Sequence, residues 1–279
     1  MLEPILRVIG SHKLRELTAG DVRSALSTMA ATYSSAAVTM GHLALKRTIR
    51  HAEAHDKVIR NVAMLVDTPK GQAGRPSRAL SRVQAAALMQ AASGTILEAY
   101  TTVSLTTGMR TEEARALSWP HVDLEGKPDA DPPVPPNVAV WHSVRAHGET
   151  KTEKSRRTLA LPQTPVQALL RQQERQEGWR REAGSRWQET GLVFTTTLGT
   201  ELDAANVRRE FRKICKDAKI EGNWTPRELR HSFVSLMSES GVPVEEIARL
   251  AGHSNTRTTE VVYRRELRPV LTRGRGNHG

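Results

Sequence analysis

Two arginines in the segment TPRELRH, Arg227 and Arg230, stand where a helix is expected to begin. Thr225 as the cap, proline at the first helical position and Glu228 three residues after the cap predict this helix start. Both arginines then lie on one side of the first turn, where backbone amides and the helix dipole favour an anion. Two guanidinium groups at such a place suit a phosphodiester. The alternative is a solvent-exposed basic helix face.

A second segment with chemistry-bearing residues is GVPVEEIARLAGHSNTRTTEVVY. It predicts a short amphipathic helix that stops at Gly252, then His253 in a turn, then a Thr-rich helix that ends at Tyr263. Taken alone, these two helices could form a helix-turn-helix. Taken with the two arginines, the histidine and the tyrosine indicate more than binding.

The composition favours a polyanionic partner. The 279 residues carry 41 Lys and Arg against 30 Asp and Glu, a net charge of +11, and no apolar run approaches the ~20 residues of a membrane span. Nucleic acid is therefore expected ahead of a membrane. The single cysteine, Cys215, excludes an internal disulfide framework and a multi-cysteine zinc site, and it favours the cytoplasm. The histidine spacings predict no metal site.

The elements that must position these residues fall into two domains. Residues 1–66 read as a small helical domain, in which Asp21 is expected to cap one helix and 36–63 runs at helical spacing without proline. Residues 67–79 form a basic linker with Pro and Gly, able to lie along phosphate. The second domain, 80–279, opens at Ser81 with a capping box.

Helices dominate the second domain, and two strands interrupt them. The strands 138–144 and 157–161 are expected to pair as a hairpin, and the Pro-rich stretch 126–137 is a loop. The expected helices begin or run at about 95, 111–117, 165–176, 204–218, 225–240 and 243–251. The fold class is therefore mainly α, with a small antiparallel β hairpin or sheet in an α+β second domain.

Four motifs occur in order along the second domain: TGMRTEEARALSW, GETKTEKSRRTLALP, TPRELRHSFVS and LAGHSNTRTTEVVY. In them the chain resembles the tyrosine recombinases of the phage integrase family, most closely the integrases of actinobacterial phages and integrative elements. The resemblance implies a tyrosine recombinase catalytic domain at 80–279. More weakly, it implies a helical, SAM-like core-binding domain at 1–66 that is truncated at its N-terminus.

The resemblance also implies the roles of the site residues. In the family pattern, Tyr263 is the nucleophile, and Arg110 and Arg230 form the phosphate clamp. Lys151 is the hairpin lysine, and His253 takes the second histidine position. Planar guanidinium donors suit the charge that gathers on the non-bridging oxygens of the transition state. A lysine can protonate the departing 5′ oxygen as general acid, and Lys151 is preferred to Lys154 because it aligns with the family position.

One position departs from the family pattern. Arg227 stands where the family usually has histidine, and guanidinium can donate a hydrogen bond to phosphate but cannot act as a base. The proton of Tyr263, whose reference pKa is ~10, then goes to His253 or water, or the tyrosine is an anion held by three arginines. Glu113, three residues after Arg110, is expected to orient an arginine, since a carboxylate that faced phosphate would repel it. The alternative for Glu113 is a solvated helix face.

The function expected from the resemblance is site-specific DNA recombination and integration through a 3′-phosphotyrosyl intermediate, without metal or other cofactor. The alternatives are a type IB topoisomerase-like enzyme and a non-catalytic DNA-binding remnant of an integrase. The expected partners are double-stranded DNA with attachment sites, a homotetramer on synapsed DNA and a directionality factor, with the protein in the cytoplasm at the nucleoid. A basic helix series that could touch DNA, or simply be solvated, comprises Arg208, Arg209, Arg212 and Lys213.

Overall fold

The computed structural model describes residues 2–73, 78–141, 143 and 156–252. The chain divides into two compact units, Met1–Pro76 and Ser77–Gly279. The division falls within the stretch 67–79 that the sequence predicts as a linker. Each unit has its own hydrophobic core.

The described residues of the first unit, 2–73, form three helices and two short 3-10 turns. They are α1 (Glu3–Ile9), α2 (Ala19–Thr32), α3 (Ser35–Glu53), and the turns Leu14–Glu16 and Val62–Leu65. The sequence predicts Asp21 as the N-cap of α2, but the N-cap in the structure is Thr18. Asp21 is the third helical residue, and its carboxylate accepts from the Thr18 backbone N–H. The two residues form a reciprocal capping box, so the sequence identified the right pair with the wrong member as cap.

The helix expected over 36–63 is shorter in the structure. α3 ends at Glu53, and Asp56 adopts a left-handed φ of +54°. Asn61 then caps the 3-10 turn through its side chain, which accepts from the Ala63 N–H. Neither proline nor glycine marks this end, which explains why apolar spacing alone overestimated the helix.

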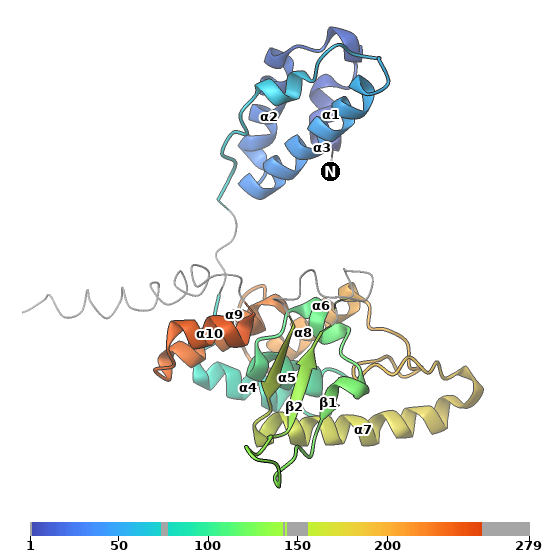
Figure 1. Ribbon diagram of the computed structural model, residues 1–279, viewed down its shortest axis with the longest axis vertical. Helices are drawn as coiled ribbons and strands as arrows, with labels where there is room; N and C mark the ends of the chain where they lie inside the picture. Colours follow the sequence, from blue (N-terminus) through green and yellow to red (C-terminus); the bar gives the residue numbers. More distant parts are fainter. Residues whose placement is uncertain (1, 74–77, 142, 144–155, 253–279) are drawn as a thin grey trace, which may run out of the picture. The chain divides into compact units, whose positions relative to one another are not determined.

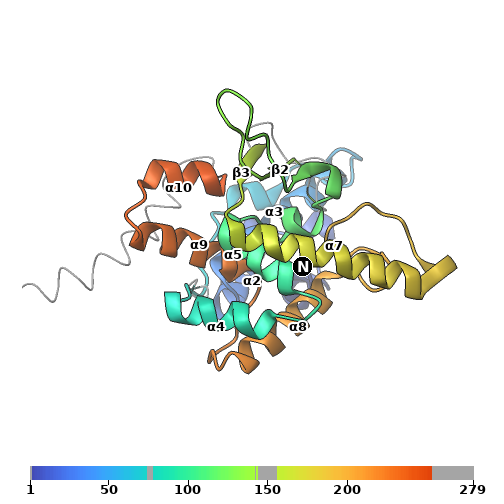
Figure 2. The same ribbon diagram turned by 90° about the horizontal axis from the view of Figure 1, so that it is seen from below.

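The second unit is built around α5 (Glu98–Thr107), of which nine of ten residues are buried. In the described part of the chain this helix contacts four others, and it forms the centre of the unit (Figures 1 and 2). The surrounding helices are α4 (Arg82–Ala92), α6 (Thr111–Arg115), α7 (Gln163–Ala183), α8 (Ala204–Asp217), α9 (Arg227–Glu239) and α10 (Val244–Ala251). α7 continues beyond the predicted end at 176, and α5 begins three residues after the expected 95.

A three-stranded antiparallel sheet packs against this helical body in the order β1-β2-β3. The strands are β1 (Val122–Asp123), β2 (Asn137–Val140) and β3 (Arg157–Ala160). β2 and β3 pair as the predicted hairpin, with Val140 opposite Arg157. β2 is shorter than the expected 138–144. The prediction of a mainly α fold with a small antiparallel sheet is confirmed.

Two predicted helix starts can be compared with the structure. Ser81 and Gln84 form the expected capping box at α4. At α9, Glu228 accepts from the Thr225 backbone N–H at 2.6 Å, but the helix begins at Arg227 with Pro226 as its N-cap, one residue later than expected. In the part of the chain that the structure describes, no helix is long and apolar enough to cross a membrane.

Candidate active site

Arg110 is delivered by a tight turn at the end of α5. Gly108 ends that helix with φ +63°, a conformation that glycine adopts without strain, and Arg110 is the N-cap of α6. Its Nη1 donates to Oε1 of Glu113 at 2.6 Å, and its backbone N–H donates to Oε2 at 2.8 Å. Its Nη2 donates to the Gly252 carbonyl at 2.7 Å. These bonds fix the guanidinium between α6 and the end of α10.

Glu113 is only 4% exposed, so it is not a solvated face. Besides Arg110 it accepts from Arg157, whose Nη2 lies 2.9 Å from Oε2 and whose Nη1 lies 3.3 Å from Oε1. Burial alone would raise the pKa of Glu113, but the hydrogen bonds and charges of Arg157 and Arg110 outweigh it and lower the pKa to about 2. Glu113 is therefore an anion shared by two arginines.

Arg157 is a residue of this site that the motif analysis did not single out. Its side chain is 9% exposed, and its Nε donates to the Leu250 carbonyl at 2.9 Å. A sequence signal existed, because alternation along β3 puts Arg157 on the same side as Leu159, which is buried. A charged residue in an inward-facing series must have a buried partner.

Arg230 reaches the same place from α9. Its Nη1 donates to the Gly108 carbonyl at 2.8 Å, and its buried Nη2 has no hydrogen-bond partner among the described residues. Burial lowers the pKa of Arg230 to about 9, and the neighbouring cations Arg110 and Arg157 contribute in the same direction. That value lies above neutral pH, so Arg230 remains a cation.

We refer to Arg110, Arg157, Arg230 and Glu113 as the arginine cluster. It holds three positive charges against one negative charge, and one buried nitrogen within it, Nη2 of Arg230, has no acceptor in the part of the chain that the structure describes. Buried donors normally have partners, and like charges repel at close range. The cluster is therefore suited to a bound anion that accepts several hydrogen bonds.

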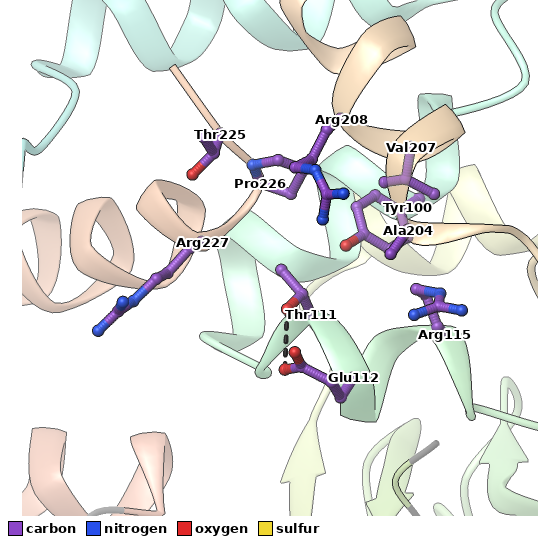
Figure 3. A pocket seen from close by; sticks show the side chains of 10 residues that line it. All are labelled: Tyr100, Thr111, Glu112, Arg115, Ala204, Val207, Arg208, Thr225, Pro226 and Arg227. Carbon is purple, nitrogen blue, oxygen red and sulfur yellow. Dashed lines mark hydrogen bonds between the residues drawn. The ribbon is translucent and has the colours of Figure 1, made fainter. Parts of the chain in front are cut away.

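Arg227 is exposed at the first residue of α9 and lines a pocket of about 360 Å³ beside the cluster. Figure 3 shows its guanidinium directed away from Tyr100, whose hydroxyl points into the pocket. The pocket lies between α5, α6, α8 and the start of α9, and it is lined by Tyr100, Thr111, Glu112, Arg115, Ala204, Val207, Arg208, Thr225, Pro226 and Arg227.

The basic residues of α8 are exposed along one side of that helix. The opposite side is buried through Val207, Phe211, Ile214 and Cys215. The exposed set comprises Arg208, Arg209, Arg212, Lys213 and Lys216. Of these five residues, Arg208 lines the pocket (Figure 3).

Three predicted site residues, Lys151, His253 and Tyr263, lie outside the described residues. Their chain neighbours are described at two points. Gly252 directly precedes His253, and β3 begins six residues after Lys151. The structure thus brings together Arg110, Glu113 and Arg230 of the predicted set.

Residues 78–268, which include all of these candidate residues, match the phage integrase family. The chain belongs to this family of tyrosine recombinases. An integrase of Streptomyces ambofaciens is 54% identical over 269 residues, which are 95% of this chain and 69% of that protein. A XerC-like tyrosine recombinase of Caldanaerobacter subterraneus is 29% identical over 188 residues, 63% of this chain and 47% of that protein.

Solved structures of integrases share the fold. The Tn1549 transposon integrase, in complex with a circular intermediate DNA, matches with a TM-score of 0.67 at 17% identity, over 96% of this chain and 92% of that one. A lambda integrase tetramer bound to a Holliday junction matches with a TM-score of 0.65 at 15% identity, over 93% of this chain and 68% of that one. The family resemblance inferred from the four motifs is confirmed.

The buried Glu113 predicts how the stability of this integrase-family unit depends on pH. Its folded-state pKa of about 2 lies below the ordinary 4.5, so its contribution is complete above pH 4.5 and is lost as the pH falls toward 2. We expect the unfolding free energies of wild type and Glu113→Gln to converge over that range, by about 3 kcal/mol.

Tryptophan fluorescence during urea unfolding measures this in the full chain, because all five tryptophans lie in the second unit. The Glu113→Gln variant serves as the reference that cancels other carboxylates. A constant difference between the two proteins from pH 5 to pH 2.5 would contradict an ionised, doubly paired Glu113.

Proposed function

We propose that this chain carries out site-specific DNA recombination and integration, cleaving and rejoining strands through a 3′-phosphotyrosyl intermediate. The observation that carries the proposal is the arginine cluster, in which two guanidinium groups share one carboxylate and Arg230 has a buried nitrogen with no acceptor among the residues that the structure describes. The cluster lies within a domain of the phage integrase family. A backbone phosphate of DNA supplies the missing anion.

The proposed reaction assigns one task to each group. The Tyr263 hydroxyl gives its proton to His253 or water, or is already an anion held by the arginines, and its oxygen attacks the scissile phosphorus. The bond to the 5′ oxygen breaks, and the 3′ phosphate becomes joined to the tyrosine. Arg110 and Arg230 stabilise the charge on the non-bridging oxygens, and Arg227 donates a further hydrogen bond. Lys151 gives a proton to the departing 5′ oxygen. A 5′ hydroxyl of another strand reverses these steps, so the bond energy is retained.

The proposed partners follow from the relatives. Double-stranded attachment-site DNA is the substrate, and a homotetramer holds two such sites in synapsis, as the lambda integrase tetramer holds a Holliday junction. A directionality factor completes the set, and the protein works in the cytoplasm at the nucleoid. This chain spans about two thirds of the Streptomyces integrase and about half of the XerC-like relative.

A suicide substrate tests this proposal. It is a duplex nicked just 3′ of the scissile phosphate, so that the short 5′-hydroxyl fragment diffuses away after attack and the protein stays attached. Protein must then remain on the strand whose 3′ end was created, and protease must remove it. DNA binding without any covalent product identifies the non-catalytic remnant instead. Relaxation of supercoiled plasmid without a preference for sequence identifies the topoisomerase-like alternative.

The proposed DNA surface predicts how binding depends on salt. The logarithm of the binding constant falls linearly with the logarithm of salt, by about 0.9 for each phosphate neutralised. We expect Arg208→Ala to reduce that slope by about one phosphate equivalent, since Arg208 is exposed and lines the same pocket as Arg227. Arg180→Ala is the control, because Arg180 is exposed on α7 and pairs with Glu189. Equal slopes for Arg208→Ala and wild type would remove α8 from the DNA surface.

A further inference from the structure

We propose that Arg157 is a positioning residue for the phosphate clamp, because it sets both the orientation and the effective charge that Arg110 presents to phosphate. This inference rests on the proposed cleavage of DNA. The side chain of Arg157 is 9% exposed whereas that of Arg110 is 39% exposed. Arg157 thus lies behind Glu113, and Arg110 lies on the open side.

The two oxygens of the Glu113 carboxylate are divided between Arg157 and Arg110. Its Oε2 accepts from Arg157 at 2.9 Å and from the Arg110 backbone N–H at 2.8 Å, and its Oε1 accepts from Arg110 Nη1 at 2.6 Å. Because Oε2 already accepts from Arg157 and from the Arg110 backbone, the guanidinium of Arg110 contacts the carboxylate through Nη1 only. Two of its five N–H groups are used in bonds to Glu113 and Gly252, which leaves three for a phosphate.

Arg157 also changes the net charge of the Glu113 and Arg110 pair. Glu113 between two guanidinium groups leaves a net charge of +1, and this charge faces the phosphate. Without Arg157, Glu113 and Arg110 would form a neutral bidentate pair, since forked donors match a carboxylate. The clamp would lose a positive charge, and Arg110 would turn its N–H groups inward. The positive charge of Arg157 also lowers the pKa of Arg230, so the three arginines interact electrostatically.

Arg157 and Arg110 both bind backbone carbonyls at the end of α10. The Leu250 carbonyl accepts from Arg157 Nε at 2.9 Å, and the Gly252 carbonyl accepts from Arg110 Nη2 at 2.7 Å. Both carbonyls belong to the helix end, where intrahelical donors run out and cations are favoured. Gly252 has φ +66°, and a Cβ there would lie 2.8 Å from Arg157 Nη1. Arg157 therefore holds the end of α10 through Leu250, and the Gly252 carbonyl of the same helix end accepts from Arg110.

The test compares single-turnover cleavage of three substrates: the natural phosphate and the two methylphosphonate stereoisomers, in which a methyl group replaces one non-bridging oxygen. Each isomer removes the contact and the charge at one oxygen, so a variant that impairs the donor to that oxygen is penalised less on that isomer. Arg110→Ala and Arg230→Ala establish the pattern of each clamp arginine.

We expect Arg157→Met to slow cleavage of the phosphate on the order of 100-fold. One isomer is the substrate on which Arg110→Ala slows cleavage least. On that isomer, Arg157→Met should cleave less than about 10-fold more slowly than wild type. Arg157→Lys keeps the charge and should recover part of the rate. A loss equal on all three substrates, or one that follows the Arg230→Ala pattern, overturns the proposal.

Arg175→Met is the matched control, because Arg175 has the same kind of contacts at another place. It donates to the buried Glu98 at 2.8 Å and to the Thr95 carbonyl at 2.7 Å. Its loss removes an ion pair and a carbonyl contact from the same unit, so it reports general destabilisation. We expect any slowing in Arg175→Met to be the same for all three substrates.

A second measurement does not depend on cleavage. In the full chain without DNA, the ¹⁵N relaxation of the Arg110 Nε–Hε pair, assigned by its absence in Arg110→Lys, should show more rapid motion in Arg157→Met than in Arg175→Met. An unchanged Arg110 signal overturns the positioning role even if the chain cleaves no DNA. Absence of cleavage by wild type, with the relaxation change present, instead overturns the proposed function alone.

Discussion

We expect the Tyr263→Phe variant to form no covalent complex with nicked DNA, while it binds the same duplex with an affinity close to that of wild type. Phenylalanine keeps the ring and removes the one oxygen that can attack phosphorus, so the loss of product is complete. The measurement is denaturing electrophoresis of the trapped complex beside a gel-shift titration of intact duplex.

The two other tyrosines supply the controls for this experiment. Tyr100 is fully buried, and burial raises the pKa of its hydroxyl. Tyr33 lies in the first unit and is 40% exposed. Tyr100→Phe and Tyr33→Phe should both trap DNA as wild type does. A covalent product from Tyr263→Phe would exclude Tyr263 as the nucleophile.

The Arg230→Met variant should lose cleavage by about 100-fold to 1,000-fold, the effect of removing one preorganised donor to an oxyanion. Its DNA affinity should fall much less, since binding is spread over many phosphates. The free energy of unfolding of the second unit should be no lower than in wild type. The lowered pKa of Arg230 means that its charge is held at a cost in the folded protein.

The combination of a stable protein and a lost activity distinguishes a functional cation from a structural one. Single-turnover cleavage and tryptophan-detected urea unfolding measure the two quantities on the same preparation. Arg175→Met provides the contrast, because Arg175 pairs with the buried Glu98, and its loss should lower stability. An Arg230→Met protein that unfolds at markedly lower urea would show that Arg230 serves the fold.

Local signals in the sequence predicted much of the fold. The Ser81 and Gln84 capping box and the apolar series of α8 are each encoded within a few residues, and the two strands around residues 140 and 157 are each encoded by their own local alternation. The length of α3 could not be obtained this way. Its end at Glu53 depends on packing of the following turn, whose Asn61 side chain donates to the Lys46 carbonyl on α3.

The candidate site was predictable to the extent that motifs carried it. Arg110 and Arg230 stand in recognisable motifs, whereas Arg157 reads as one more basic residue in a basic hairpin. Its role follows from contacts with Glu113 and Leu250, which are 44 and 93 positions away in the chain. Separations of that size depend on how the sheet packs against α6 and α10, and a single sequence does not encode them locally.

The arginine cluster draws its members from α6, β3 and α9, all within Ser77–Gly279, while Met1–Pro76 has a hydrophobic core of its own. For engineering, this separates two design problems. Libraries that alter the first unit, or that exchange it for the corresponding unit of a relative, can search for new target preferences without altering the residues of the arginine cluster. Substitutions at Gly108 and Gly252 belong outside such libraries, because a Cβ there would meet Phe233 and Arg157 respectively.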